Sequence, residues 1–267
     1  FTAIERGYML SLLEAAKPFV GEDGFAGIRI STRPDAINEE ILTILKEYHV
    51  NAIELGVQSM NDRVLLANKR GHTAQDVVRA SGLIRDFQIE LGLQMMTGLY
   101  QSTWQDDVDT AKAIAALHPK TVRIYPTITL EGTDLAVFYQ QGLYQPMSLE
   151  DSVKLCSDLL EFFEEQDIQV IRLGLHAQES LEQGYLAGPY HPAFRELCEG
   201  RIYLKKALLQ IDQFPEKTPL TIYVNPKELS KMAGQNRCNL NYLKQRNPIK
   251  IKPDDSLEAF CVRVESV

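Results

Sequence analysis

Residues 54–62 read ELGVQSMND, and Arg70 follows shortly afterwards. The apolar start of this stretch predicts a buried strand, and the polar residues after it turn the chain toward a helix. Period-2 alternation places Glu54, Gly56 and Gln58 on one side of the strand, where Gly56 leaves room for a bulky group. Because α/β proteins hold ligands at the carboxyl ends of parallel strands, Gln58 is a candidate ligand contact, and a helix cap is its structural alternative.

Strand-like and helix-like segments alternate on both sides of this stretch. The predicted strands are 27–30, 52–57, 89–96, 121–125 and 168–173. The predicted helices include 38–47, 61–67, 73–87, 103–117, 134–141 and 148–166. Repeated strand–helix units of this kind indicate a parallel sheet with right-handed crossovers, so residues 1–193 form an α/β part.

The pattern changes at about residue 194, where strands and helices no longer alternate strictly. The predicted elements there are helices 194–210 and 226–232 and strands 220–224, 249–251 and 260–264. We therefore interpret residues 194–267 as a small C-terminal α/β element. Residues 230–237 are polar and partly basic; they predict a solvated loop, and contact with a nucleic-acid substrate is the alternative.

The composition is typical of a globular protein. The chain has 267 residues, of which 45% are hydrophobic and 24% charged, and its formal net charge is −8. The acidic balance argues against a generic nucleic-acid groove or an anionic membrane surface, although it is compatible with a local basic patch. We find no run of about 18 apolar residues and no signal-peptide pattern, so we expect no membrane span and a cytoplasmic location.

The four cysteines are widely dispersed in the sequence. They form neither a CxxC nor a CxxxCxxC motif, so no local metal cage is predicted. In a chain without a secretion signal, we expect reduced thiols in the core.

Seven segments, taken together, carry a family resemblance. They are IRISTRPD (28–35), ELGVQSMND (54–62), KRGH (69–72), LQMMTGL (93–99), VRIYP (122–126), IRLGLHAQ (171–178) and AGPYHPAFREL (187–197). In this order and spacing they resemble the radical SAM superfamily. They are most similar to its branch with the Elongator catalytic subunit and the bacterial oxygen-independent coproporphyrinogen III oxidase-like proteins. The resemblance implies a partial TIM-like (β/α) radical SAM barrel with parallel strands.

The resemblance also implies a chemistry and its cofactors. In this family a 4Fe-4S cluster, held by three thiolates and fed by an external electron donor, reduces S-adenosylmethionine (SAM) to a 5′-deoxyadenosyl radical. The family's CxxxCxxC motif and its glycine pair before SFTA lie upstream of the region that this chain covers, since the chain opens with FTA. We therefore interpret it as an oxidoreductase-type radical SAM enzyme without its N-terminal strands, and expect it to bind no cluster and to be inactive as given. Strand 27–31 is then an open barrel edge, which self-association or the N-terminal residues would cover.

Four cofactor-binding residues follow from the resemblance. Gln58 matches a glutamine that contacts the SAM ribose, and an amide can donate to and accept from hydroxyls. Arg70 matches an arginine that binds the SAM carboxylate, for which a planar bidentate donor is suited. Arg29 and Gln94 occupy inward strand positions where relatives place acidic ribose contacts, so both depart from the pattern. An ion pair with Glu54 is the structural alternative for Arg29.

Five residues at strand ends are substrate-facing candidates. They are Arg33, Tyr125, Arg172, His176 and Gln178. For His176 the alternative is a hydrogen-bonded structural histidine. The pattern identifies no catalytic residue and no metal ligand.

Two functional hypotheses follow. The first is a radical SAM enzyme that acts on an unknown substrate, either a tRNA base, by analogy with the Elongator subunit, or a porphyrin-like small molecule. The acidic net charge weighs against tRNA. The second is a non-catalytic (β/α)-barrel binding protein derived from the SAM pocket. Substrate contacts are not encoded in the motifs, so the sequence does not name the substrate.

Overall fold

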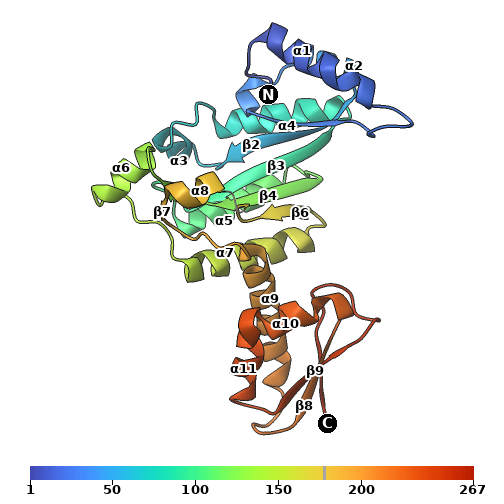
Figure 1. Ribbon diagram of the computed structural model, residues 1–267, viewed down its shortest axis with the longest axis vertical. Helices are drawn as coiled ribbons and strands as arrows, with labels where there is room; N and C mark the ends of the chain where they lie inside the picture. The colour runs from blue at the N-terminus through green and yellow to red at the C-terminus, as the bar shows by residue number, and fades with distance from the viewer. Residues whose placement is uncertain (177–178) are drawn as a thin grey trace. The chain divides into compact units, whose positions relative to one another are not determined.

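The computed structural model describes residues 1–176 and 179–267, which form two compact units (Figure 1). Unit 1 comprises Phe1–Met147, Phe162–Leu173 and Ala177–Pro189. Unit 2 comprises Ser148–Glu161, Gly174–His176 and Tyr190–Val267. The boundary that the sequence suggested, between residues 193 and 194, stays a prediction.

Unit 1 is built on a five-stranded sheet whose neighbouring strands are all parallel, in the order β1-β2-β3-β4-β6. The strands are β1 (Ile28–Thr32), β2 (Val50–Gln58), β3 (Glu90–Thr97), β4 (Thr121–Pro126) and β6 (Gln169–Leu173). Each corresponds to a strand that the hydrophobic pattern predicted. The predicted parallel α/β architecture is therefore confirmed.

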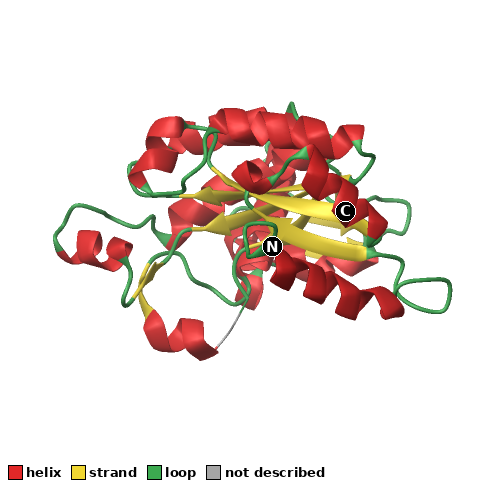
Figure 2. Ribbon diagram, turned by 90° about the horizontal axis from the view of Figure 1, so that it is seen from above, coloured by secondary structure: helices red, strands yellow, loops and turns green. Residues whose placement is uncertain are grey.

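Helices connect these strands, and Figure 2 distinguishes them from the sheet by colour. They are α1 (Arg6–Ala16), α2 (Glu39–Glu47), α3 (Asp62–Ala67), α4 (Ala74–Asp86), α5 (Trp104–Ala115), α6 (Asp134–Gln140) and α8 (Glu179–Gly184), with the 3-10 turns η1 (Lys17–Phe19) and η2 (Pro34–Ala36). α7 (Leu149–Glu165) is divided between the two units. Thr73 and Thr103 begin α4 and α5 with complete capping boxes, which fixes where these helices start.

The two faces of the parallel sheet differ in polarity. Leu55, Leu93 and Ile124 are fully buried on the face against which helices such as α4 and α5 pack. Gln58 and Gln94, on the opposite face, remain half-exposed. The alternation read from the sequence thus separates a covered apolar face from a polar face that is open in unit 1.

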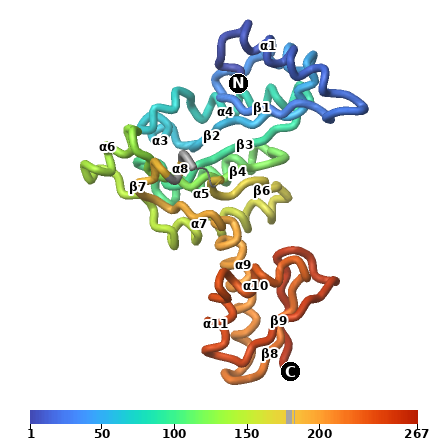
Figure 3. Tube along the Cα trace, viewed as in Figure 1, coloured from blue at the N-terminus to red at the C-terminus, as the bar shows by residue number. Residues whose placement is uncertain are grey.

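The N-terminal residues contact the carboxyl end of β1, an edge strand of this sheet (Figure 3). The Phe1 nitrogen donates to the Ser31 carbonyl oxygen at 2.8 Å, and the Thr2 hydroxyl donates to the Ala36 carbonyl oxygen at 2.7 Å. These contacts lie at the carboxyl end of β1, whereas Arg29 and Ser31 are exposed, so the covering of this edge by the N-terminal residues stays a prediction. Self-association stays a prediction.

Unit 1 also contains a two-stranded antiparallel pair that the sequence did not predict. It consists of β5 (Thr129–Leu130) and β7 (Tyr185–Ala187). Strands of two and three residues are too short to show a hydrophobic period.

Unit 2 is a smaller α/β element. Its three-stranded sheet has the order β10-β8-β9, in which β9 is parallel and β10 antiparallel to β8. The strands are β8 (Leu220–Val224), β9 (Ile249–Pro253) and β10 (Arg263–Ser266). The helices are α9 (Phe194–Ile211), α10 (Leu229–Ala233) and α11 (Cys238–Lys244), with the 3-10 turns η3 (Pro226–Glu228) and η4 (Gln235–Arg237). Tyr203, Ile222 and Val224 are fully buried in a hydrophobic core between the helices and the sheet.

Two details of unit 2 differ from the sequence prediction. The last strand begins at Arg263, because the backbone amides of Phe260 and Cys261 bond to the Tyr203 hydroxyl and the Glu258 carbonyl instead of to a sheet. α11 was not predicted at all. It is short, and Leu240 and Leu243 give too little periodicity for recognition. None of the described helices is long and apolar enough to cross a membrane.

Candidate functional site

Gln58 ends β2 and lies beside Gln94 of β3. The Gln94 Nε2 donates to the Gln58 Oε1 at 2.9 Å. Gln58 has a φ of 65°, and the β2–β3 register shifts between Gly56 and Gln58. A Cβ placed on Gly56 would lie 2.9 Å from the Gln58 Nε2. The room expected beside Gly56 is thus used by the Gln58 amide itself, and a glycine there keeps the amide pair in place.

Arg70, in the loop after α3, reaches the neighbouring part of β3. Its Nη2 lies 3.3 Å from the Met96 sulfur, which is a weak acceptor. Its Nε is buried and has no hydrogen-bond partner among the described residues. Burial lowers the pKa of Arg70 from its ordinary value, but an arginine remains charged. A buried donor without a partner is costly, and a ligand carboxylate would satisfy it.

Arg70 and the amide pair share one face and one end of the sheet. Gln58 is opposite Met95 in the strand register, and Arg70 contacts the next residue, Met96. The side chains of Gln94 and Met96, two residues apart on β3, point to the same face. Gln58 and Arg70 are therefore neighbours of the same short part of β3.

A cavity of about 350 Å³ adjoins Arg70. Met96, Tyr100 and Phe138 supply apolar and aromatic walls, with the two rings 4.6 Å apart. A mostly apolar cavity with a cation at its edge is the usual form of a small-molecule site. Gln58 and Gln94 do not line it.

Arg29 does not join this group. Its guanidinium pairs with Glu90 at 2.5 Å and lies 3.9 Å from Glu54. It is opposite Ala52 in the register, six residues before Gln58, which is about 20 Å along a strand. This position argues against a cofactor contact for Arg29, whose role stays a prediction. The ion-pair alternative holds, with Glu90 as the main partner, because β3 brings Glu90 beside β1 across β2.

Arg123 is a polar-face residue that the sequence analysis missed. Its Nε lies 2.8 Å from the Glu54 Oε2, and its Nη1 donates to the Tyr125 hydroxyl at 3.4 Å. Burial raises the pKa of Glu54, and the nearby Arg123 and Arg29 partly oppose this. The alternation in VRIYP is the sequence signal that could have identified Arg123. In the structure Arg123 is opposite Gln94 in the strand register. Tyr125 is opposite Met96, so it lies at the same end of the sheet as Arg70.

The remaining candidates are placed as follows. Arg33 pairs with Asp35 at 2.7 Å, and this partner raises the pKa of Arg33. The Arg33 Nη2 also donates to the Gly71 carbonyl oxygen at 3.3 Å, next to Arg70. Arg172 of β6 is opposite Arg123, and its buried Nε has no partner among the described residues.

Two candidates are not placed on the parallel sheet of unit 1. His176 is exposed and belongs to unit 2. Gln178 lies outside the described residues.

Metal ligands are not gathered in the part of the chain that the structure describes. No three His, Cys, Asp or Glu side chains there could hold a metal ion together. Cys156 and Cys198 are buried, and Cys238 and Cys261 are exposed. Burial raises the pKa of the Cys198 thiol, which disfavours the thiolate that a cluster needs. The expectation that this chain binds no cluster stays a prediction.

The fold and the site together define a class of protein. Unit 1 is a partial (β/α) barrel, and its polar face carries an amide pair close to a half-buried arginine that has no ion pair with the described residues. Such a site is suited to a ligand with hydroxyls and a carboxylate. Both groups are present in SAM, so the residues at hand fit this ligand.

Two family models match the chain. The Radical SAM superfamily matches residues 3–114, and the Radical_SAM C-terminal domain matches residues 119–204. The chain therefore belongs to the radical SAM superfamily, which implies SAM and a 4Fe-4S cluster as the family's cofactors.

Curated relatives support the Elongator branch. An uncharacterized protein of Methanocaldococcus jannaschii is 34% identical over 51% of this chain and 43% of its own length. The tRNA uridine(34) acetyltransferase of the same organism is 30% identical over 57% of this chain and 29% of the enzyme. Human Elongator complex protein 3 is 30% identical over 50% of this chain and 25% of that protein. The chain thus matches less than half the length of each of these relatives.

Solved structures support the fold. Methanocaldococcus infernus Elp3 with an N-terminal deletion has a TM-score of 0.62 at 23% identity, over 78% of this chain and 52% of that one. Coproporphyrinogen III oxidase of Escherichia coli has a TM-score of 0.50 at 17% identity, over 61% of this chain and 38% of that one. The expected radical SAM barrel with parallel strands is confirmed.

Proposed function

We propose that this chain is the SAM-binding part of a radical SAM enzyme that modifies a base of tRNA. The observation that carries the proposal is the half-buried Arg70 guanidinium, whose Nε is buried without a partner among the described residues and which lies beside the Gln58–Gln94 amide pair. The preference for tRNA rests on relatives that are named tRNA uridine(34) acetyltransferases. A tRNA substrate is consistent with the predicted cytoplasmic location.

The residues of unit 1 would divide the binding work. Arg70 would hold the carboxylate, since its Nε and Nη groups present parallel donors. In the hydrogen bond between the two side chains, the Gln94 Nε2 is the donor and the Gln58 Oε1 is the acceptor. The Gln58 Nε2 and the Gln94 Oε1 both remain within 4 Å of the Cβ position of Gly56. One donor and one acceptor are therefore left for the two ribose hydroxyls.

The bound cofactors would supply a 5′-deoxyadenosyl radical, using electrons from an external donor. The chain's own contribution is to orient SAM and to shield it. Met96, Tyr100 and Phe138 form the apolar wall that excludes water near Arg70. The cluster ligands would come from a CxxxCxxC segment outside this chain. We propose that the chain as given is inactive for that reason.

The alternatives have weaker support. A porphyrin-like substrate rests on likeness of fold to coproporphyrinogen III oxidase alone, and fold does not imply function. A non-catalytic binding protein would keep the same SAM contacts. The two possibilities differ in chemistry: only the enzyme, joined to its cluster segment and reduced, forms 5′-deoxyadenosine.

Calorimetric titration of the chain with SAM tests the proposed site. Arg70→Ala removes a charge-assisted bidentate contact, which contributes about 1.5–3 kcal/mol, so Kd should rise roughly 10- to 100-fold. Arg29→Ala is the matched control, because Arg29 is an arginine on the same sheet face at the other end of the strands. It should change Kd less than about twofold. Equal affinities of wild type and Arg70→Ala would rule out the carboxylate role.

A further inference from the structure

Basic residues gather in one part of unit 2. Residues 213–252 contain eight Lys or Arg and two Asp or Glu, a net charge of +6. The rest of the chain contains 20 Lys or Arg and 34 Asp or Glu, a net charge of −14. The acidic total of −8 therefore hides a strongly basic segment, and such asymmetry is typical of a surface for polyanions.

Most of these cations have no anionic partner. Lys231 pairs with Glu199 and Glu228, and Arg246 pairs with Asp212. The other six are exposed and form no ion pair with any residue that the structure describes. They are Lys217, Lys227, Arg237, Lys244, Lys250 and Lys252. Six unpaired cations on one small α/β element repel one another unless a ligand supplies negative charge.

An unusual turn lies within this basic segment. β8, α10, α11 and β9 follow one another as strand, helix, helix and strand, and Gly234–Arg237 joins the two helices. Gly234, Asn236 and Arg237 have φ values of 76°, 51° and 60°, in the left-handed region that favours glycine. The Gln235, Asn236 and Arg237 side chains are exposed. Asn236 and Arg237 are consecutive non-glycine residues in this conformation, and both face solvent, which makes the turn a candidate site.

The Asn239 side chain, two residues after the turn, ties this part of the chain to α9 and α10. The Asn239 Nδ2 donates to the Gly200 carbonyl oxygen at 2.8 Å and to the Met232 carbonyl oxygen at 3.3 Å. In the KH module, a Gly-x-x-Gly loop clamps an RNA backbone. The Gly-Gln-Asn-Arg turn resembles that loop, with Arg237 in place of the second glycine and in a glycine-like conformation.

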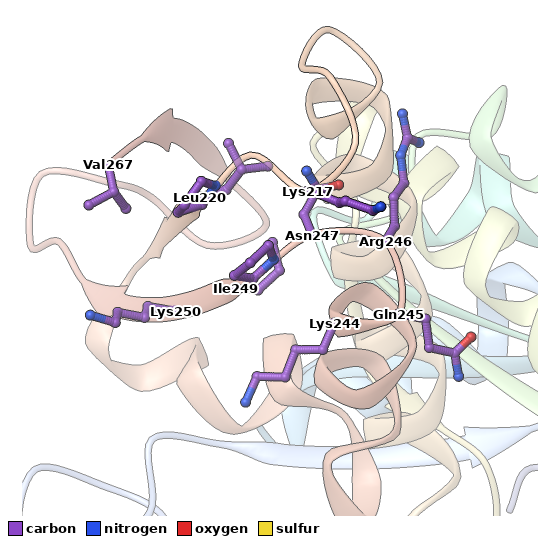
Figure 4. A pocket seen from close by; sticks show the side chains of 11 residues that line it. Lys217, Leu220, Lys244, Gln245, Arg246, Asn247, Ile249, Lys250 and Val267 are labelled. Carbon is purple, nitrogen blue, oxygen red and sulfur yellow. The ribbon is translucent and has the colours of Figure 1, made fainter.

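Cations stand at both ends of α11. Arg237 directly precedes the helix, in a left-handed conformation, and Lys244 is its last residue, about 10 Å further on; both are exposed. Lys244 lines a cavity of about 540 Å³ at the amino-terminal ends of β8 and β9. Figure 4 shows Leu220 and Ile249 within this pocket, with Lys217, Lys244 and Lys250 around them.

We propose that unit 2 binds single-stranded RNA along α11. The phosphates lie on Arg237, Lys244 and Lys250, and one unstacked base enters the pocket against its exposed apolar residues Pro219, Pro248 and Val267. Charge complementarity selects a polyanion, and the apolar recess selects one whose bases are free, as sequence-recognising RNA modules do. This inference deepens the proposed function and rests on it for the choice of RNA, since a tRNA-modifying enzyme must hold its substrate by a separate surface.

Fluorescence anisotropy with a labelled 12-nucleotide single-stranded RNA tests this surface on the whole chain, without SAM or cluster. Lys244→Glu should weaken binding at least tenfold at 50 mM salt. Lys244→Gln should lower the slope of log K against log salt by about 0.7–1, because one phosphate contact is lost. Lys120→Glu, at an exposed lysine of unit 1 that has no ion pair with the described residues, is the matched charge control and should change the affinity less than twofold.

The turn is tested separately. Asn236→Asp places a carboxylate in the turn without changing its shape, because Asp tolerates the left-handed conformation; it should weaken binding at least fivefold. Gln88→Asp is the matched control, since Gln88 is an exposed amide of unit 1 with a φ of 56°. Arg237→Gly keeps the backbone conformation and removes only the cation, so its loss of affinity isolates the charge.

Each outcome bears on the proposal. Losses confined to the unit 2 variants support it. Equal losses in Lys120→Glu or Gln88→Asp, equal affinity for a duplex of the same sequence, or binding to phosphatidylserine vesicles without binding to RNA would overturn it. The SAM titration fails or succeeds independently, because it uses no RNA. RNA binding without SAM binding refutes only the proposed function, and SAM binding without RNA binding refutes only this inference.

Discussion

The sheets of the two units place their polar residues in opposite ways. In unit 1, Glu54 and Arg123 form an ion pair on the polar face, and Gln58 bonds to Gln94. In unit 2, β9 alternates apolar residues with Lys250, which is exposed and has no ion pair with the described residues. Buried polar groups need fixed partners, whereas exposed charges do not. Fixed partners define a site for one small ligand, and free cations define a surface for an extended polyanion.

Arg70 is the exception that locates the site in unit 1. It is a half-buried cation whose Nε has no partner among the described residues, and it lies beside the Gln58–Gln94 amide pair. In unit 2 the exceptional residues are the non-glycine residues of the turn, Asn236 and Arg237. The comparison teaches that an unsatisfied group in unit 1 and a strained backbone in unit 2 indicate different kinds of ligand.

The largest expected effect tests the two faces of the parallel sheet. Leu93→Ala removes a fully buried side chain from the covered face and should lower the free energy of unfolding by about 2–5 kcal/mol. Gln94→Ala, at the next residue on the polar face, should cost less than about 1.5 kcal/mol, the net contribution of one hydrogen bond. Urea unfolding followed by the fluorescence of Trp104, which lies in unit 1, measures both. Similar costs at the two positions would contradict the two-faced description.

The second prediction concerns pH. Burial raises the pKa of Asp107 to about 6, although the Ser102 hydroxyl and the Gly98 amide donate to it. Between its ordinary pKa and this value the folded state binds more protons, so the free energy of unfolding should fall as pH rises from about 4 to 6. The decrease is at most about 3 kcal/mol. Asp107→Asn should lack this dependence in urea titrations at several pH values.

For Asp254 of unit 2 we expect the opposite pH dependence of the free energy of unfolding. Hydrogen bonds from the Ser256 side chain and amide, and the nearby Arg263, lower the pKa of this half-exposed carboxyl. Its stabilisation is present above its ordinary pKa and is lost as pH falls through the lowered value. Asp254→Asn should therefore remove a stability loss at acid pH. A pH profile that Asp107→Asn and Asp254→Asn change in the same direction would refute this contrast.

The last prediction concerns the helix pair of unit 2. Asn239→Ala leaves the buried carbonyl oxygens of Gly200 and Met232 without their donor, which should cost about 1–3 kcal/mol. Asn241→Ala changes an exposed asparagine of the same helix and should stay within about 0.5 kcal/mol. Thermal unfolding followed by circular dichroism compares them. Equal effects would show that Asn239 does not anchor the turn.

Local signals determined much of unit 1 from the sequence. Apolar runs and alternation identified its five parallel strands, and Thr73 and Thr103 marked the starts of α4 and α5. The ordered motifs identified the family, and with it Gln58 and Arg70 as candidate contacts. Such features depend on residues close together in the chain, so they can be recognised without knowledge of the fold.

Only the tertiary structure decided which distant residues meet. It paired Arg29 with Glu90, filled the space beside Gly56 with the Gln58 amide, and brought Arg70 to Met96. It also formed α11, whose periodicity is weak and whose residues Asn239 and Leu243 are held by packing. Strand order and register fix these contacts, and both follow from packing energies summed over the whole unit, which no local pattern encodes.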